Sequence, residues 1–182
     1  VGDPDQLPPV GPGCPLSDIL RSGVVPAVRL TEIFRQAQES LIVMNAHRVK
    51  SGVMPDLKTV TSDFFFLRRR TEEAVASTIG DLCRTRLPDR MGIPPEEIQV
   101  LSPTRKGPTG TATLNLLLQA QLNPPAPDKK EKKWGDFSFR EGDRVMQIRN
   151  NYDILWKKTD GTQVGTGIFN GDIGVITEID LN

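Results

Sequence analysis

The chain has 182 residues, enough for one domain or slightly more, and its 37% hydrophobic and 25% charged residues are typical of a globular protein. Its 23 basic and 23 acidic residues give zero net charge, which excludes nucleic-acid binding by bulk electrostatics but permits a local basic groove. One histidine and two distant cysteines predict no metal site, and no apolar run approaches the roughly 18 residues of a membrane span. We expect Cys14 and Cys83 to be reduced thiols of a cytoplasmic protein.

The first stretch, GDPDQLPPV at residues 2–10, places the uncharged amide of Gln6 between Asp3 and Asp5, ahead of a proline-rich turn. A glutamine in a rigid, glycine-flanked loop can orient an attacking water or register a terminal phosphate. Glycine, proline and aspartate are also the usual residues of surface turns, so an ordinary turn is the alternative. The loop is therefore a candidate nucleotide contact.

The next elements are a short helix over residues 16–20 and an apolar, β-branched strand over residues 23–30. Ser40 is then expected to cap a helix that runs to about Lys50. Arg35 lies shortly before that helix, where a planar guanidinium could clamp a phosphoryl group in its transition state. An ion-paired surface arginine is the alternative for this position.

Further strands are expected over residues 63–67 and 97–101. They alternate with a helix that Thr71 caps and with a helix over residues 114–122, which a pair of prolines stops. This alternation of strands and helices predicts an α/β fold with a parallel sheet flanked by helices.

The loop SPTRKGPTGT, at residues 102–111, follows an expected strand and precedes an expected helix, where parallel sheets usually bind ligands. Its hydroxyls, the cations Arg105 and Lys106, and free backbone amides at the helix N-terminus suit a phosphodiester. A polar connection between strand and helix is the alternative. The order G-x-x-x-x-G-K-[ST] of a Walker A loop is absent from the sequence.

The pattern changes after a polar linker at residues 124–133. Residues 137–180 contain short apolar strands separated by hairpin-type turns at Asp160-Gly161 and Asn170-Gly171. We therefore expect a small all-β portion, which is not complete where the chain ends.

Several of these segments together resemble the RecD/TraA-type superfamily 1 DNA helicases. GDPDQLPPV resembles their motif III, LTEIFRQ at residues 30–36 resembles motif IV, and VLSPTRKGPTG at residues 100–110 resembles a characteristic loop after a strand. FREGDRVMQ, NNY and FNGDIG, at residues 139–147, 150–152 and 169–174, are similar to the segment that leads into an inserted β domain. The resemblance covers essentially the whole chain, in the family's order.

The resemblance implies roles for individual residues. Gln6 would contact the γ-phosphate of ATP in a nucleotide site with Gly2 and Asp3, and Arg35 would be the arginine finger. The single-stranded DNA would pass near Thr104, Arg105 and Lys106. ATP and Mg²⁺ would be cofactors of the whole protein, because the Walker A, Walker B and later motifs are expected before Val1 and after Asn182.

By the same resemblance, residues 1–29 would end a RecA-like motor domain 1A, residues 30–136 would form motor domain 2A, and residues 137–182 would begin an SH3-like 2B insertion. The chain would be a fragment of an ATP-dependent 5′→3′ DNA helicase of the exodeoxyribonuclease V alpha-subunit type. Such a helicase acts in DNA recombination and repair, with single-stranded DNA and other recombination-complex subunits as partners, and the fragment alone would be inactive. A helicase domain of a mobilisation relaxase, or a catalytically dead nucleic-acid-binding adaptor, are the alternatives.

Overall fold

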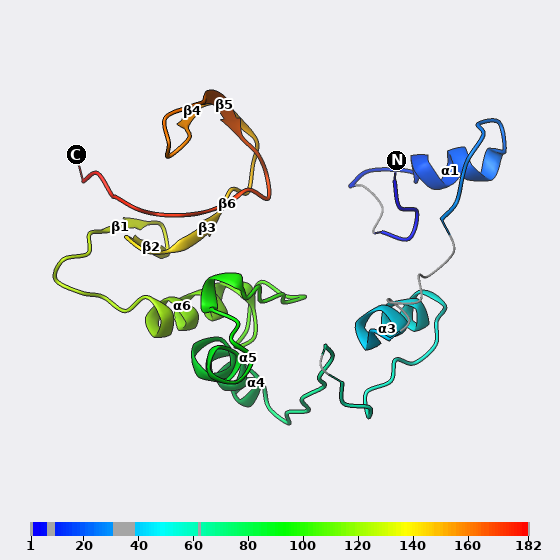
Figure 1. Cartoon of the computed structure of the whole chain (residues 1–182), viewed down its shortest axis with the longest axis horizontal. Coiled ribbons are helices and arrows are strands. Elements are labelled where there is room, and N and C mark those ends of the chain that lie inside the picture. Colours follow the sequence, from blue (N-terminus) through cyan, green and yellow to red (C-terminus); the bar gives the residue numbers. More distant parts are fainter. Residues whose placement is uncertain (1, 7–9, 31–38, 62, 182) are drawn as a thin grey trace. The chain divides into compact units, whose positions relative to one another are not determined.

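The computed structural model describes residues 2–6, 10–30, 39–61 and 63–181. The chain divides into two compact units, Val1–Arg68 and Arg69–Asn182, and each is described by itself (Figure 1). None of the described helices combines the length and apolar character needed to cross a membrane.

The first unit contains helices α1, Pro15–Ser22, and α3, Leu41–Lys50, close to their predicted positions. Ser40 caps α3 as predicted, because its Oγ accepts a hydrogen bond from the Val43 amide at 3.2 Å. The same hydroxyl donates to Asp63 Oδ2 at 2.6 Å, and this bond is the main cause that lowers the pKa of Asp63 to about 2. The cap thus ties the start of α3 to a residue 23 positions later in the chain.

Asn45, on α3, is the buried polar residue of this unit. Its Nδ2 donates to the Asp56 carbonyl at 2.9 Å, and its Oδ1 accepts from the Asp56 amide at 2.7 Å. This pair of bonds satisfies both ends of the side-chain amide and fixes the loop after α3 on the helix.

A long helical run opens the second unit. It begins with α4, Glu72–Asp81, capped by Thr71, continues through a π-helical turn, Leu82–Arg86, and ends with α5, Leu87–Met91. A short 3-10 turn, Pro95–Glu97, and helix α6, Thr111–Leu122, follow.

The helices of the second unit share a small core. Ala76, Cys83 and Leu114 are its buried hydrophobic side chains, and α4 packs against α6. Burial raises the pKa of the Cys83 thiol, as expected for a buried structural cysteine.

The remainder of the second unit is β-structure, as the sequence predicts. Three antiparallel pairs, β1–β2, β3–β6 and β4–β5, make up its sheets. Their strands are Glu131–Trp134, Phe137–Arg140, Arg144–Met146, Asn151–Lys157, Val164–Ile168 and Ile173–Val175. The first strand begins at Glu131, inside the segment expected to be a linker, because β1 pairs with β2 through a tight turn.

The mixed helix and strand class is confirmed, but the expected parallel sheet is not among the described pairings. Residues 23–30, 63–67 and 97–101 have no strand assignment in the described part of the chain. Val28, Leu30 and Leu101 are 93%, 97% and 87% exposed, so these three side chains lack the packed neighbours that they would have in a buried strand. A strand needs the backbone groups of an adjacent strand, which its own apolar pattern does not provide.

Candidate functional site

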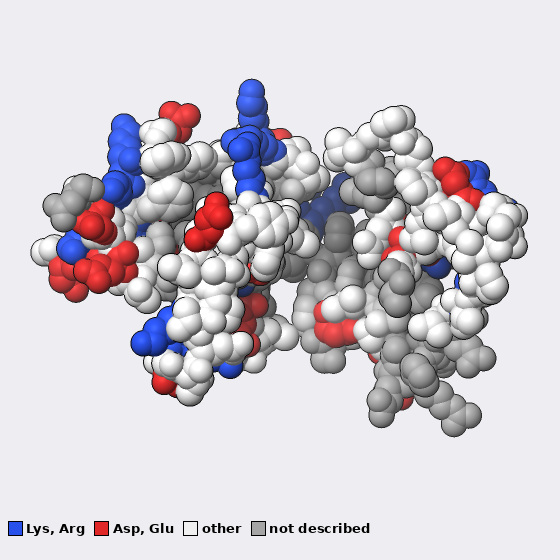
Figure 2. All heavy atoms as spheres, turned by 90° about the horizontal axis from the view of Figure 1, so that it is seen from above, with Lys and Arg blue, Asp and Glu red and all other residues white. Residues whose placement is uncertain are grey.

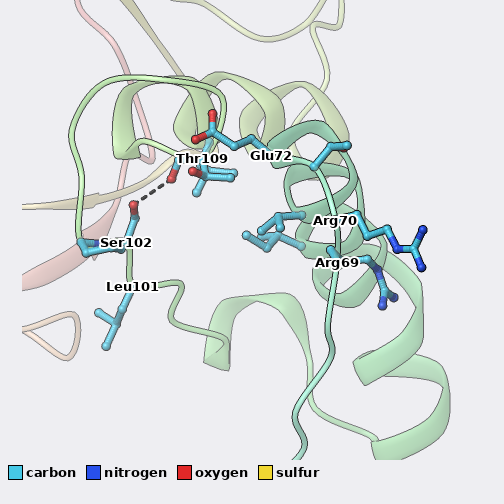
Figure 3. Close-up of a pocket in the computed structure, with 11 residues that line it drawn as sticks. Arg69, Arg70, Glu72, Leu101, Ser102 and Thr109 are labelled. Atoms are coloured by element: carbon cyan, nitrogen blue, oxygen red, sulfur yellow. Dashed lines mark hydrogen bonds between the residues drawn. The ribbon is translucent and has the colours of Figure 1, made fainter.

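The loop at residues 102–110 lies between the segment after the 3-10 turn and helix α6, in the second unit. Ser102 organises it: its Oγ accepts from the Thr104 amide at 3.2 Å and donates to the Thr109 carbonyl at 2.7 Å (Figure 3). One side chain therefore joins the two ends of the loop.

The loop also folds back on the first turn of α6. The Thr111 amide donates to the Thr104 carbonyl at 3.0 Å, and the Ala112 amide donates to the Arg105 carbonyl at 3.3 Å. These are two of the amides that a helix N-terminus normally leaves without a partner. The expectation that the loop offers free helix amides to a phosphate is therefore wrong for the Thr111 and Ala112 amides, because both already donate to carbonyls of the loop.

Glycine is required at Gly110, where the loop meets the helix. A Cβ there would lie 2.5 Å from the Lys106 carbonyl oxygen and 2.6 Å from the Arg105 carbonyl oxygen. Gly107 has a φ of +89°, a region that side-chain-bearing residues rarely adopt. The two glycines allow the tight path of the loop, in which the intervening Pro108 and Thr109 are half-buried.

Thr104, Arg105 and Lys106 are all exposed. Within the described part of the chain, no hydrogen bond or ion pair engages the side chains of Arg105 and Lys106. On the face drawn in Figure 2, basic and acidic groups are interspersed, consistent with the zero net charge. Two unengaged cations on a fixed loop can each meet a phosphate without first breaking a protein contact.

A cavity of about 360 Å³ lies beside the loop (Figure 3). Its apolar lining comes from Val75, Ile79, Leu101, Pro103 and Leu114, and its polar lining comes from Arg69, Arg70, Thr71, Glu72, Ser102 and Thr109. Figure 3 shows the side chains of Arg69 and Arg70 pointing away from Ser102 and Thr109. Arg69 Nε donates to Thr78 Oγ1 at 2.7 Å, so that cation is directed to the helix surface. The cavity therefore lacks the convergent cations of a phosphate site, and the exposed part of the loop is the better candidate.

The turn at residues 2–6 is the second candidate, in the first unit. Asp3 Oδ1 accepts from the Asp5 amide at 3.0 Å, and Asp3 Oδ2 accepts from Gln6 Nε2 at 3.5 Å. Lys50 Nζ lies 2.5 Å from Asp5 Oδ2. The turn therefore holds the neutral amide of Gln6 against the Asp3 carboxylate. Lys50 offsets the charge of the neighbouring Asp5, which lowers part of the repulsion that a phosphate would meet here.

The structure brings the predicted site residues together only within each loop. Gly2, Asp3 and Gln6 share the first turn, and Thr104, Arg105 and Lys106 share the second loop, in the other unit. Arg35 lies outside the described residues. The described residues contain no group of three or more His, Cys, Asp or Glu side chains that could hold a metal ion.

Sequence reasoning missed Lys50, the anchoring role of Ser102 and the steric role of Gly110. Ser102 and Gly110 bound the loop, so a serine at the start of a strand-to-helix connection and a glycine at its end were the available signals. Lys50 lies 45 residues after Asp5, and no local pattern connects them.

Comparisons with known proteins give the two ends of the chain separate matches. Residues 114–182 match the family described as the ATP-dependent RecD-like DNA helicase SH3 domain, and residues 1–63 match an AAA domain family. The SH3 match includes all six described strands, and the AAA match includes the turn at residues 2–6.

Among individual proteins, the chain is similar to the "ATP-dependent RecD2 DNA helicase" of Deinococcus radiodurans, with 33% identity over 176 residues. That match covers 97% of this chain and 21% of the relative. An uncharacterized protein of Methanocaldococcus jannaschii is 27% identical over 219 residues, which cover 96% of this chain and 18% of that protein. The chain thus spans about a fifth of the length of the relatives it matches.

Proposed function

Because this chain belongs to the RecD-type helicases, we propose that it is part of an ATP-dependent DNA helicase that moves 5′→3′ on single-stranded DNA and acts in DNA recombination and repair. The observation that carries the proposal is the 33% identity to the Deinococcus helicase, which extends through 97% of the chain and includes the loop at residues 102–110. The exposed, unengaged Arg105 and Lys106 on that loop supply a chemical basis for contact with a DNA backbone.

We assign residues 1–29 to the end of a RecA-like motor domain, residues 30–136 to a second motor domain and residues 137–182 to the start of an SH3-like insertion. The match of residues 1–63 to an AAA domain includes the first segment, and the SH3 match of residues 114–182 includes the last, although both matches also extend into the second segment. In a two-domain motor, nucleotide-dependent opening and closing of the cleft moves one domain along the strand.

In this proposal Gln6, with the backbone of Gly2 and Asp3, contacts the γ-phosphate, and Arg35 stabilises the charge that develops on the transferred phosphoryl group. The neutral amide of Gln6 and the Asp5–Lys50 ion pair fit an anion nearby. The described residues contain no group of three or more His, Cys, Asp or Glu side chains that could hold Mg²⁺. We therefore derive no step through the metal, and we assign the remaining ATP contacts to other parts of the longer protein.

The DNA assignment is tested by the salt dependence of binding. Each phosphate contact to a single strand contributes about 0.7 to the slope of log affinity against log salt. In the full-length helicase that contains this chain, replacing Arg105 and Lys106 together by alanine should lower the slope by roughly 1.4. The change should weaken binding to all sequences alike, because backbone contacts carry no base information. Fluorescence anisotropy with one labelled oligonucleotide at several salt concentrations measures this.

The matched control is Arg84→Ala with Arg90→Ala, two exposed arginines on the helical run that remove the same charge. The control should retain the wild-type slope, apart from a small general electrostatic effect. Equal slopes for the Arg105/Lys106 variant and the wild type would show that these two side chains do not contact the DNA backbone.

The nucleotide assignment is tested in the full-length helicase that contains this chain. Arg35→Ala should lower the ATPase kcat by about 10³-fold or more, the scale of arginine fingers. Arg29→Ala, six residues away and exposed, is the control and should leave kcat near wild type. Near-normal turnover in the Arg35 variant would eliminate the finger role.

A further inference from the structure

A buried polar junction joins the C-terminal end of α6 to the β-structure. Asn123 directly follows α6 and is 9% exposed, and its Nδ2 donates to the Glu141 carbonyl at 3.1 Å and to Asp143 Oδ1 at 2.7 Å. The guanidinium of Arg140, which is 7% exposed, donates to the Asn123 carbonyl. Arg140 Nε also donates to Glu131 Oε1 at 2.7 Å, so the buried cation is paired with a carboxylate.

Gln119 extends the junction one helical turn back along α6. Its Nε2 donates to the Ser138 carbonyl at 2.8 Å and to Asp143 Oδ2 at 2.5 Å. Asp143 Oδ2 accepts the Arg140 amide as well, at 2.8 Å. The Asp143 carboxylate therefore accepts hydrogen bonds from two side chains of the helix end and from the β2 backbone. Such a network is rigid when its members are satisfied, because each bond fixes the geometry of the next.

A second attachment lies on the other side of the loop at residues 102–110. Arg144, the first residue of β3, donates from its guanidinium to the Ile98 carbonyl at 2.8 Å, four residues before Ser102. The β-structure is thus hydrogen-bonded to the segment before the loop and to the helix after it. The helix itself is a rod of 12 residues, about 18 Å long at 1.5 Å per residue.

We propose that Gln119, Asn123, Asp143 and Arg140 form a rigid joint that makes the loop at residues 102–110 and strands β1–β3 move as one body. The loop is fixed to the start of α6 by the Thr104 and Arg105 carbonyls, and the joint fixes the end of α6 to the strands. The four side chains are positioning residues for Arg105 and Lys106. Only this last consequence, that the strands set where these cations meet single-stranded DNA, rests on the proposed function.

The joint is tested by measuring the distance distribution between two spin labels in the chain. Thr104→Cys and Lys133→Cys, both exposed, place one label on the loop and one on β1, in a Cys14→Ser background that leaves only the buried Cys83. We expect one narrow distribution in the parent and a broadened or multiple distribution after Asn123→Ala. Gln119→Ala removes a half-buried amide only, and it keeps the test valid if the Asn123 variant does not fold.

Gln121→Ala is the matched control, because it removes the same amide from the same helix, where Gln121 Oε1 has no hydrogen-bond partner among the described atoms. Its distribution should stay as narrow as in the parent. Far-UV circular dichroism before each measurement separates a loosened joint from an unfolded chain. An unchanged distribution in a folded Gln119→Ala variant would overturn the joint.

Binding of single-stranded DNA separates this inference from the proposed function. With a rigid joint and a DNA-binding loop, Gln119→Ala, which changes no charge, should lower the salt slope toward that of the Arg105/Lys106 double variant, and Gln121→Ala should not. A broadened distribution with unchanged DNA affinity and slope would support the joint and overturn the positioning of DNA contacts by it.

Discussion

Asp63 shows how one carboxylate organises a helix start from a distance in sequence. It accepts hydrogen bonds from Ser40 Oγ at 2.6 Å, from Thr61 Oγ1 at 2.5 Å and from the Ile42 amide at 3.4 Å. These bonds favour the ionised form and lower its pKa from 3.8 to about 2. Since the folded-state pKa is depressed, the stabilisation is complete above pH 3.8 and is lost as the pH falls toward 2.

Replacing Ser40 by alanine should therefore raise the pKa of Asp63 toward its ordinary value, because the bond from Ser40 is the largest cause of the shift. The measurement is an NMR titration of the side-chain carboxyl carbons. Asp160 is an internal control, because hydrogen bonds from Thr162 lower its pKa independently of Ser40. An Asp63 pKa that stays near 2 in the variant would assign the shift to its other partners.

The loop at residues 102–110 can keep its geometry only if residue 110 has no Cβ. Gly110→Ala should push the Arg105 and Lys106 carbonyls away, because the added Cβ would lie within 2.6 Å of both. The hydrogen bond from the Ala112 amide to the Arg105 carbonyl, 3.3 Å in the wild type, should then weaken. Faster hydrogen exchange at the Ala112 amide is the expected result.

The control for this change is Gly174→Ala on β6. A Cβ there meets no atom within 4 Å, and no positive φ is recorded for Gly174. Exchange at Ala112 should remain at the wild-type rate in this variant. The same rate in Gly110→Ala would mean that the loop accommodates the methyl group elsewhere.

At the scale of elements, helix α4 depends on its first turn. Thr71 Oγ1 accepts from the Ala74 amide at 3.2 Å, and Glu72 and Glu73 lie in the positive first turn of the helix. Thr71→Ala should lower the free energy of unfolding of the second unit by about 1 kcal/mol. Urea unfolding followed by circular dichroism measures the change.

Ser77→Ala, at an exposed position inside the same helix, should instead raise the free energy of unfolding slightly, because alanine has the higher helix propensity. A Thr71 variant as stable as the wild type would show that packing of α4 on α6, and not the cap, holds the helix start.

The elements that could be predicted from sequence are those whose cause is local. The caps Ser40 and Thr71 and the prolines after α6 act within a few residues, and the three helices they bound are confirmed. Residues 23–30 and 97–101 have strand composition, but pairing depends on a neighbouring strand and is not a property of the segment.

The candidate site shows the same division. The position of the loop at residues 102–110, before a helix, follows from the sequence, and so does the exposure of its cations. The use of the Thr111 and Ala112 amides by the loop's own carbonyls depends on its three-dimensional path. The Asp5–Lys50 ion pair likewise arises only when residues 45 positions apart meet.

At the scale of the whole molecule, we predict that this chain alone does not hydrolyse ATP above background. Phosphoryl transfer depends on positioning and electrostatic stabilisation. The sequence has no G-x-x-x-x-G-K-[ST] loop, and the described residues include no group of three or more His, Cys, Asp or Glu side chains that could hold a metal ion. Phosphate release measured with and without single-stranded DNA tests this, and DNA-stimulated turnover that co-purifies with the chain over successive columns would contradict it.

The π-helical turn between α4 and α5 has a consequence for the comparison of related sequences. The Leu87 amide bonds to the Leu82 carbonyl, five residues back, so this turn holds one residue more than an α-helical turn. A related sequence can therefore lack one residue in this turn, and the faces of α4 and α5 would keep their orientation. Pro88 limits that freedom, since its ring would collide with the carbonyl four residues earlier in a regular α-helix. A natural sequence one residue shorter here is therefore expected to have lost this proline as well, so length and residue type should change together.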